Sequence, residues 1–196
     1  MSHLKKELPP DTKAVRVEDG GTASRADIYD WIQCVVTALV FCVLMFSFFV
    51  RIVDVDGSSL YPTLEDADKV IVSDLFYSPK QGDIIVFRKD EYKDKPLVKR
   101  VIAVGGQTVE IDFSEGIVYV DGVALDEPYT ADLTKEKLDF TGKVTVPEGS
   151  VFVLGDNRMH STDSRYSVIG CVDERYIMGK VYFTVFPVKN FGSVYG

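Results

Sequence analysis

WIQCVVTALVFCVLMFSFFV, residues 31–50, is a run of twenty residues without a charged side chain. As an α-helix rising about 1.5 Å per residue, the run is roughly 30 Å long, which is the thickness of the hydrocarbon core of a bilayer. A helix in the core of a soluble protein is rarely apolar on every side over this length. The sequence therefore predicts a single transmembrane helix at residues 31–50, between a short N-terminal tail and a larger C-terminal region.

A cleavable secretory signal is the alternative to a permanent anchor. Such a signal has an apolar region of roughly 7–15 residues, followed by a small-residue cleavage site. The stretch that follows here is Arg51-Ile52-Val53-Asp54, without an Ala-x-Ala pattern, so we expect an uncleaved anchor. The polar tail, residues 1–30, with a short helix expected from Ser24, carries five Lys or Arg and six Asp or Glu. Charge therefore gives only a weak signal for the orientation of the span.

The whole chain has an ordinary globular composition and an acidic charge. Its 196 residues are 46% hydrophobic and 27% charged, which excludes a wholly disordered chain. A net charge of −8 argues against nucleic acid as a partner, because nucleic-acid binding needs a basic surface. The three cysteines, Cys34, Cys42 and Cys171, have no Cys-x-x-Cys spacing, so we expect neither a zinc site nor a disulfide framework.

Residues 51–196 have the pattern of short β-strands and are numerous enough for one independent core. Apolar, β-branched runs alternate with Gly and Pro turns, and Asp121-Gly122 is a strong two-residue hairpin signal. We expect a mainly β, antiparallel or barrel-like sheet, with residues of about 107–148 forming a smaller inserted lobe. A polar stretch at 130–140 has the composition of a helix. The expected strands are 69–72, 83–88, 98–104, 116–120, 144–146, 151–154 and 180–185.

Two stretches could supply a nucleophile and its base. Ser59 lies in a turn between Gly57 and Pro62, where a serine can expose its Oγ while its own N–H faces a developing oxyanion. Serine is also an ordinary turn residue. Lys99 lies within an apolar strand, where lysine is usually solvated. If its amine is buried, the charged form is disfavoured and the amine can act as a base on a serine hydroxyl.

A third stretch, Gly155 to Arg165, is dense in polar groups. Its sequence, GDNRMHSTDSR, holds two carboxylates, two arginines and several hydroxyls directly after an apolar strand. Functional sites are commonly built on loops at such strand ends. A solvated loop with local Asx and Ser turns has the same composition, so the residues alone leave both interpretations open.

Together these stretches resemble the type I signal peptidase family, the membrane-anchored Ser/Lys proteases that release secreted proteins. The family's Gly-x-Ser-Met-x-Pro-Thr-Leu box is similar to residues 57–64, and its Lys-Arg-Val-Ile box is similar to residues 99–102. Its Gly-Asp-Asn-Arg-x-x-Ser-x-Asp-Ser-Arg box resembles residues 155–165 at every specified position. The three boxes follow a single span in the family's order, and the resemblance runs to about Gly192.

The resemblance implies a role for each matched residue. Ser59 would be the nucleophile and Lys99 the general base, with the Ser59 backbone N–H as an oxyanion donor. Ser161 would hydrogen-bond and orient the Lys99 amine. The supporting residues would be an ion-pair network of Asp163, Arg165 and Arg100, and the loop residues Gly155, Asp156 and Asn157. The resemblance implies no metal and no organic cofactor.

Three positions depart from the family's pattern. Gly57 stands where some members have a hydroxyl side chain, which leaves the second oxyanion donor unassigned. Leu60 replaces the usual Met, a nearly volume-conserving exchange. Gly105-Gly106-Gln107 stands where the family favours Pro-Gly-Asp, so a rigid turn and a carboxylate outside the dyad are lost.

The implied activity is that of a signal peptidase I, an endopeptidase that cleaves exported precursors at Ala-x-Ala sites. The residues before the cleavage site would lie as an added strand, with small side chains in shallow apolar pockets. The implied topology is a cytoplasmic tail at 1–30, an anchor at 31–50 and an extracytoplasmic peptidase domain at 51–196 in a cell membrane, which we expect to be bacterial. The implied partners are precursors bearing signal peptides, the lipid bilayer and the secretion translocon.

Other functions have some support in the sequence. His160 and Asp163 invite a Ser/His/Asp interpretation, although a loop histidine is more often a surface residue. Self-cleaving repressors share a Ser/Lys dyad, but they carry a DNA-binding domain where this chain has a span. A non-catalytic accessory protein of pilus assembly would lack the Ser or the Lys, and this chain has both. A dedicated pilin-processing peptidase stays open as a narrower form of the same activity.

Overall fold

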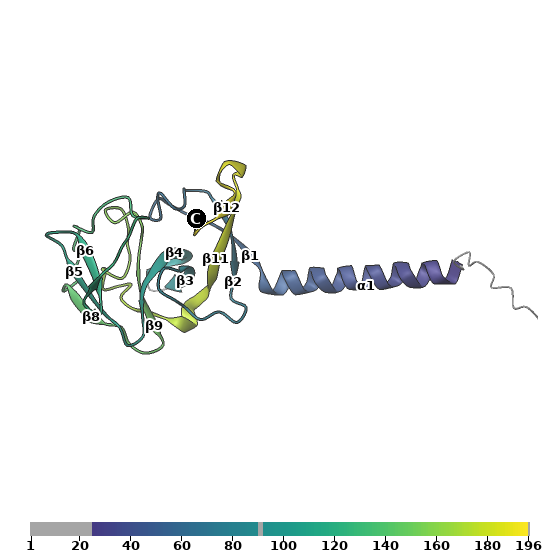
Figure 1. Cartoon of the computed structure of the whole chain (residues 1–196), viewed down its shortest axis with the longest axis horizontal. Coiled ribbons are helices and arrows are strands. Elements are labelled where there is room, and N and C mark those ends of the chain that lie inside the picture. Colours follow the sequence, from purple (N-terminus) through teal and green to yellow (C-terminus); the bar gives the residue numbers. More distant parts are fainter. Residues whose placement is uncertain (1–24, 90–91, 196) are drawn as a thin grey trace, which may run out of the picture. The chain divides into compact units, whose positions relative to one another are not determined.

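The computed structural model describes residues 25–89 and 92–195, so most of the expected tail, including Ser24, lies outside the described residues. It begins with one long helix, α1 (Arg25–Phe49), and continues as a β domain (Figure 1). Residues Asp27–Ser47 of α1 are long and apolar enough to cross a membrane, and none of this stretch is buried by the protein. An apolar surface without protein cover fits a membrane anchor, as the run at 31–50 predicts.

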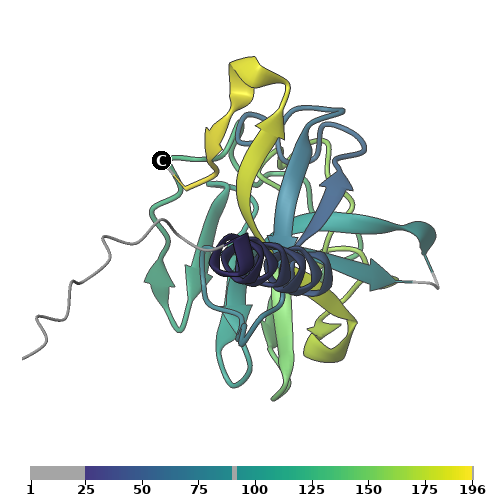
Figure 2. The same cartoon turned by 90° about the vertical axis from the view of Figure 1, so that its right-hand side faces the viewer.

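The larger sheet of the β domain is antiparallel and open. Its strands run in the order β1-β2-β11-β3-β4-β9-β10, with β12 paired to β11. Figure 2 shows β3 and β4 extending side by side, in register from Ile84 opposite Arg100 to Phe87 opposite Leu97. The strands are β1 (Arg51–Asp54), β2 (Lys69–Ser73), β3 (Ile84–Lys89), β4 (Lys93–Val104), β9 (Ser150–Leu154), β10 (Val172–Asp173), β11 (Ile177–Phe186) and β12 (Gly192–Ser193).

The expected fold class is confirmed as mainly antiparallel β, but the sheet does not close into a barrel. Its two outer strands, β1 and β10, pair with one neighbour each among the described residues. Closure needs outer strands long enough to pair along a staggered register. β1 has four residues and β10 has two, so neither offers a long edge to the other.

A second, four-stranded antiparallel sheet has the order β7-β6-β5-β8. The Asp121-Gly122 hairpin predicted from the sequence joins β6 to β7, and both residues have positive φ angles, 51° and 79°. Positive φ at both central residues is the requirement of the tight turn that matches strand twist. The strands are β5 (Thr108–Asp112), β6 (Ile117–Val120), β7 (Val123–Ala124) and β8 (Lys143–Thr145).

The segment at 130–140, which has the composition of a helix, consists of bends, a turn and irregular backbone instead. Its polar groups bond to distant parts of the chain. Thr134 Oγ1 accepts from Arg158, and the Glu136 carbonyl accepts from Arg165. These tertiary bonds take the place of the hydrogen bonds along the chain that would form a helix. The structure also has two short 3₁₀ helices, η1 (Glu174–Tyr176) and η2 (Val188–Asn190).

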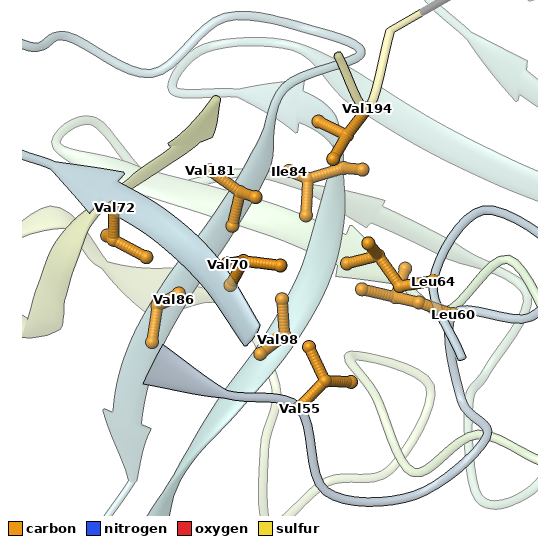
Figure 3. Packing of buried hydrophobic residues seen from close by; sticks show 10 residues of the cluster. All are labelled: Val55, Leu60, Leu64, Val70, Val72, Ile84, Val86, Val98, Val181 and Val194. Carbon is orange, nitrogen blue, oxygen red and sulfur yellow. The ribbon is translucent and has the colours of Figure 1, made fainter. Parts of the chain in front are cut away.

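Three clusters of buried hydrophobic residues form the core of the β domain. One of them joins β2, β3, β4 and β11 to the segment that follows β1. Figure 3 shows Leu60 and Leu64 of that segment side by side, pointing toward the strands that carry Ile84 and Val98. The segment between β1 and β2 is therefore fixed by apolar packing as well as by its backbone.

Candidate active site

The segment between β1 and β2 forms a turn that is fixed by backbone hydrogen bonds between its two ends and by the packing of two buried leucines. Val55 N donates to the Asp68 carbonyl (2.8 Å), and Ala67 N donates to the Val55 carbonyl (3.0 Å). Leu60 and Leu64 anchor the turn in the core. Burying each leucine contributes about 1.5–3 kcal/mol relative to exposure. A short turn fixed in this way presents its polar residues in a defined geometry.

Ser59 lies at the top of this turn, directly before the buried Leu60, and is half-buried, whereas Ser58 is exposed. Gly57 begins the turn with a φ of +95°, a conformation that L side chains rarely adopt. Its N–H donates to Asp66 Oδ1 at 2.7 Å. The turn therefore favours glycine at 57, and the site has no hydroxyl side chain at that position.

Lys99 brings an amine to the Ser59 hydroxyl from the middle of β4. Lys99 is 3% exposed, and Ile85 of β3 lies opposite it in the sheet. Nζ donates to Ser59 Oγ at 2.8 Å and to the Val98 carbonyl at 2.9 Å. Burial disfavours the charged form of an amine. The two groups singled out in the sequence as nucleophile and base are thus in hydrogen-bond contact.

The loop that follows β9 holds the backbone of the two serines. Asn157 N donates to the Ser59 carbonyl at 3.0 Å, and Asn157 Nδ2 donates to the Ser58 carbonyl at 3.1 Å. Gly155 lies so close that an added Cβ would stand 2.4 Å from the Ser59 carbonyl oxygen and 2.2 Å from Ser161 Oγ. Glycine is therefore needed at 155 because the loop and the turn approach each other backbone to backbone.

Arg100 pairs with Asp156, which differs from the expected network with Asp163. Arg100 Nε and Nη2 donate to the two carboxylate oxygens at 2.8 and 2.7 Å, and Thr63 Oγ1 donates to the same carboxylate at 2.5 Å. Burial alone would lower the pKa of Arg100, but the hydrogen bonds and charge of Asp156 outweigh it and raise the pKa. This ion pair joins β4 to the loop beside Ser59.

Asp163 and Arg165 form a second, separate pair that is fully buried. Arg165 Nε and Nη2 donate to the two oxygens of Asp163, each at 2.9 Å, and Gly155 N also donates to Asp163 at 3.1 Å. A bidentate arginine with further hydrogen bonds is the arrangement in which a buried charge pair is satisfied. The resemblance implies a single ion-pair network, but the structure has two separate pairs. Both pairs fix the loop at 155–165.

Ser161 is buried, and its Oγ has no hydrogen-bond partner among the described residues. The expected bond from Ser161 to the Lys99 amine is therefore not among the hydrogen bonds that the structure contains. Gly155 lies beside this hydroxyl, because its missing Cβ would contact both Oγ and Cβ of Ser161. A buried hydroxyl without a partner is costly, which makes it a notable feature of the site.

His160 lies in the same loop but is exposed, and its backbone N donates to the Asn157 carbonyl. Both carboxylate oxygens of Asp163 accept from Arg165, and Ser59 Oγ contacts Lys99. The geometry thus favours lysine over histidine as the base. In the part of the chain that the structure describes, no three His, Cys, Asp or Glu side chains gather as metal ligands would.

Sequence reasoning missed three residues beside the site. Arg158 belongs to the third box, but its partner, Glu127, lies 31 residues away in the chain. Tyr129 was not predicted either, although the centroid of its ring lies 3.9 Å from Arg100 Cζ. Neither Glu127 nor Tyr129 stands in a pattern that points to a site. The unassigned Arg158 in a box of assigned residues was the one available signal.

A serine hydroxyl held against a buried lysine amine, on a turn whose backbone is fixed from both sides, is the arrangement of a hydrolase with a serine nucleophile and a lysine base. Comparison with known proteins gives the family. Residues 28–186 match the family described as signal peptidase, peptidase S26. Since this match covers most of the chain, the chain belongs to that family.

Two sequence relatives agree with the family match. The chain is 35% identical to signal peptidase I of Bacillus licheniformis over 184 residues, which are 88% of this chain and 96% of the relative. It is 37% identical to the probable signal peptidase I-1 of Synechocystis sp., over 83% of this chain and 85% of the relative. A crystal structure of a signal peptidase I from Enterococcus faecalis has 35% sequence identity and a TM-score of 0.45, over 53% of this chain and 97% of that chain.

Proposed function

We propose that this chain is a signal peptidase I, a serine endopeptidase that removes signal peptides from exported precursor proteins. The observation that carries the proposal is the 2.8 Å contact between Lys99 Nζ and Ser59 Oγ, with the amine buried. A serine hydroxyl is a weak nucleophile unless a base within hydrogen-bond reach takes its proton. The family match and the names of the relatives support the same activity.

The proposed reaction has two steps. Neutral Lys99 takes the proton of Ser59 while Oγ attacks the scissile carbonyl, and the proton then passes to the leaving amine, which is the new N-terminus of the mature protein. This leaves the signal peptide as an ester on Ser59. Lys99 next takes a proton from water, the resulting hydroxide attacks the ester, and Ser59 regains its proton as the signal peptide leaves. The Ser59 backbone N–H would stabilise the oxyanion in each step.

The supporting residues would act by holding this geometry. Asn157, Gly155 and the Arg100–Asp156 pair fix the serine turn against the loop, and the Asp163–Arg165 pair fixes the loop itself. Ser161 would orient the Lys99 amine, which requires its unpartnered hydroxyl to turn toward Nζ. The precursor would bind as an added strand, with small side chains before the cleavage site in shallow pockets.

The anchor would place enzyme and precursor on one surface. We propose a cytoplasmic tail at 1–30, a transmembrane helix at 31–50 and an extracytoplasmic domain at 51–196, with an inserted lobe of about 107–148. The lipid bilayer and the secretion translocon would then be its neighbours. Confining both reactants to a membrane raises their effective concentration, which favours precursors that still carry their signal peptide.

Cleavage of a precursor with an Ala-x-Ala site by the purified full-length protein in detergent tests the activity and the dyad. We expect Ser59→Ala and Lys99→Met to lower the rate by at least about a thousandfold, because the two residues act as a unit. Ser58→Ala is the matched control, since it removes the neighbouring hydroxyl, and it should cleave as the wild type does. A folded wild type that cleaves none of a range of precursors would contradict the proposal.

The Ser/His/Asp alternative is tested by His160→Ala in the same assay. Because His160 is exposed and Ser59 Oγ contacts Lys99, the variant should keep most of the wild-type rate. Complete loss of cleavage by a folded His160→Ala protein would overturn the assignment of lysine as the base.

A further inference from the structure

Arg158 is a buried arginine that clamps the loop beside Ser59 to a distant segment. Its Nε donates to the Gly155 carbonyl at 3.0 Å. Its Nη1 and Nη2 donate to Glu127 Oε2 and Oε1 at 2.9 and 2.5 Å, and Nη1 also donates to Thr134 Oγ1 at 2.5 Å. One guanidinium thus links the catalytic loop to Glu127 and Thr134. We call residues 127–136 the strap.

The strap contacts the loop at further points. Ala131 N donates to the Asp156 carbonyl at 3.0 Å. The Tyr129 ring lies 3.9 Å from Arg100 Cζ, and its hydroxyl donates to Glu127 Oε1 at 2.9 Å. At the far end of the strap, the Glu136 carbonyl accepts from Arg165 at 2.8 Å. The strap therefore supports both buried ion pairs as well as Arg158.

Asn157 connects the strap to the nucleophile. It lies between Asp156 and Arg158, two loop residues that each bond directly to the strap. From that position it donates to the carbonyls of Ser58 and Ser59. Hydrogen bonds from Asn157 therefore hold the backbone that carries the nucleophile, and the strap holds the residues on either side of Asn157.

We propose that the Glu127–Arg158 ion pair is a positioning device for Ser59, which acts through Gly155 and Asn157. The proposal rests on the proposed peptidase function, in which Ser59 must lie against Lys99 and the scissile carbonyl. Attack requires the reacting atoms to be aligned at a separation of about 3–3.5 Å, and a misplacement of about 1 Å costs about a hundredfold in rate. The side chain of Arg158 is 1% exposed and that of Glu127 is 11% exposed, so most of the pair is out of contact with bulk water.

Three variants distinguish an effect of the pair on the position of Ser59 from an effect on the stability of the fold. Glu127→Gln removes the charge and keeps the shape, but it leaves a guanidinium buried without an anion. Glu127→Gln combined with Arg158→Met removes both charges, so the fold should recover, because replacing a buried pair by uncharged groups of similar volume is often neutral. The double variant also lacks the hydrogen bond from Arg158 Nε to the Gly155 carbonyl, whose donor Glu127→Gln alone retains. Glu110→Gln breaks the exposed Glu110–Lys143 pair of the second sheet and is the matched control.

Cleavage kinetics of the full-length proteins give the first readout. We expect both Glu127 variants to lose roughly ten- to a hundredfold in kcat with KM unchanged, because the substrate still binds but Ser59 is misplaced. The double variant should melt near the wild-type temperature and still show this loss, and Glu110→Gln should match the wild type in all respects. A double variant with wild-type kcat, or losses that vanish once rates are divided by the folded fraction, would overturn the proposal.

Hydrogen exchange of the Asn157 amide gives a second readout that needs no substrate. This amide donates to the Ser59 carbonyl, so its protection reports the contact between loop and turn. We expect faster exchange at residues 155–158 in both Glu127 variants, with the amides of β3 and β9 unchanged. Wild-type protection at 155–158 in the double variant would contradict the proposal even if no precursor is cleaved, so its failure is distinct from failure of the proposed function.

Discussion

Lys99 and Arg100 are adjacent cationic residues on β4 with different surroundings. Arg100 faces the Asp156 carboxylate, which accepts two hydrogen bonds from it and raises its pKa despite burial. The Lys99 amine, on the opposite face of the strand, contacts the Ser59 hydroxyl and the Val98 carbonyl. Because successive side chains of a strand point to opposite faces, Arg100 reaches Asp156 in the loop and Lys99 reaches Ser59.

Gly155 is the residue at which the close approach of loop and turn can be tested. In Gly155→Ala the new methyl group would overlap the Ser59 carbonyl and Ser161, so the turn or the loop must move. We expect a destabilisation of about 1–3 kcal/mol together with a large loss of cleavage. Thermal unfolding and the precursor assay measure both effects.

Gly192→Ala is the control for this substitution, because nothing lies within 4 Å of the position of its Cβ. It should leave stability and cleavage close to the wild type. A Gly155→Ala protein that behaves like Gly192→Ala would contradict the packing described between Gly155 and Ser59.

Asp163 allows the buried ion pair to be compared with an exposed one. Asp163→Asn would leave the buried Arg165 guanidinium without its anion, and we expect a loss of about 3–5 kcal/mol in the free energy of unfolding. Asp173 pairs with Arg175 at the surface, where the hydrogen bond from Arg175 lowers the pKa of Asp173 to about 2. Denaturant unfolding should show little change for Asp173→Asn. Equal effects of the two substitutions would rule out a special role for burial.

At the scale of elements, local pattern located seven of the described strands and missed β1, β5, β7, β10 and β12. Apolar, β-branched runs gave β2, β3 and β9 to within one residue of their observed bounds, and the middle of β11, because each of these strands contributes side chains to the buried core. β1, β10 and β12 have two to four residues and form through pairing with other strands of the larger sheet, whereas the two residues of β7 pair with β6 across the Asp121-Gly122 hairpin. Alternation of apolar and polar residues in such short pieces is uninformative.

Around the site, too, the sequence located individual residues but not their partners from distant segments. The three boxes located Ser59, Lys99 and the loop at 155–165, because their residue types and order match a family. The partners of Arg100 and Arg158 could not be found in this way. Arg100 pairs with Asp156 and Arg158 pairs with Glu127, and each pair joins segments that lie far apart in the chain. The stretch at 130–140, which includes part of the strap, has a helix-like composition, because composition does not reveal tertiary hydrogen bonds.

Leu60 tests how far the turn between β1 and β2 depends on its packing. Leu60→Ala would leave a cavity beneath Ser59, and we expect a loss of about 2–5 kcal/mol in unfolding free energy with reduced cleavage. Leu60→Met keeps the volume, so it should cost less than about 1.5 kcal/mol and retain cleavage. Chemical denaturation and the precursor assay compare the two. A Leu60→Ala protein as stable as Leu60→Met would mean that this cluster does not hold the turn.

At the scale of the whole molecule, the folding core and the anchor are separate parts of the sequence. Every buried hydrophobic side chain that the structure describes lies between Val55 and Val194, so α1 contributes none. The side chains described along Asp27–Ser47 lack protein cover. The physical requirements of the two parts therefore differ, because the β domain needs water around it and the helix needs lipid.

This separation predicts that a protein comprising residues 51–196 folds without α1. We expect its melting temperature to match that of the full chain in detergent. It should cleave a short soluble peptide with an unchanged kcat/KM, but lose much of its rate on a precursor embedded in vesicles, because the shared surface is gone. Failure of the shortened protein to fold would show that α1 contributes to the core after all.

The most direct test of the central claim is to find the residue that becomes acylated. Full-length protein is mixed with precursor, quenched in acid within the first turnover, digested and mapped by mass spectrometry. The account predicts the mass of the signal peptide as an ester on Ser59, and none in Lys99→Met, because the hydroxyl then lacks its base. An ester on Ser58 or Ser161, or an equal yield of Ser59 ester without Lys99, would contradict it.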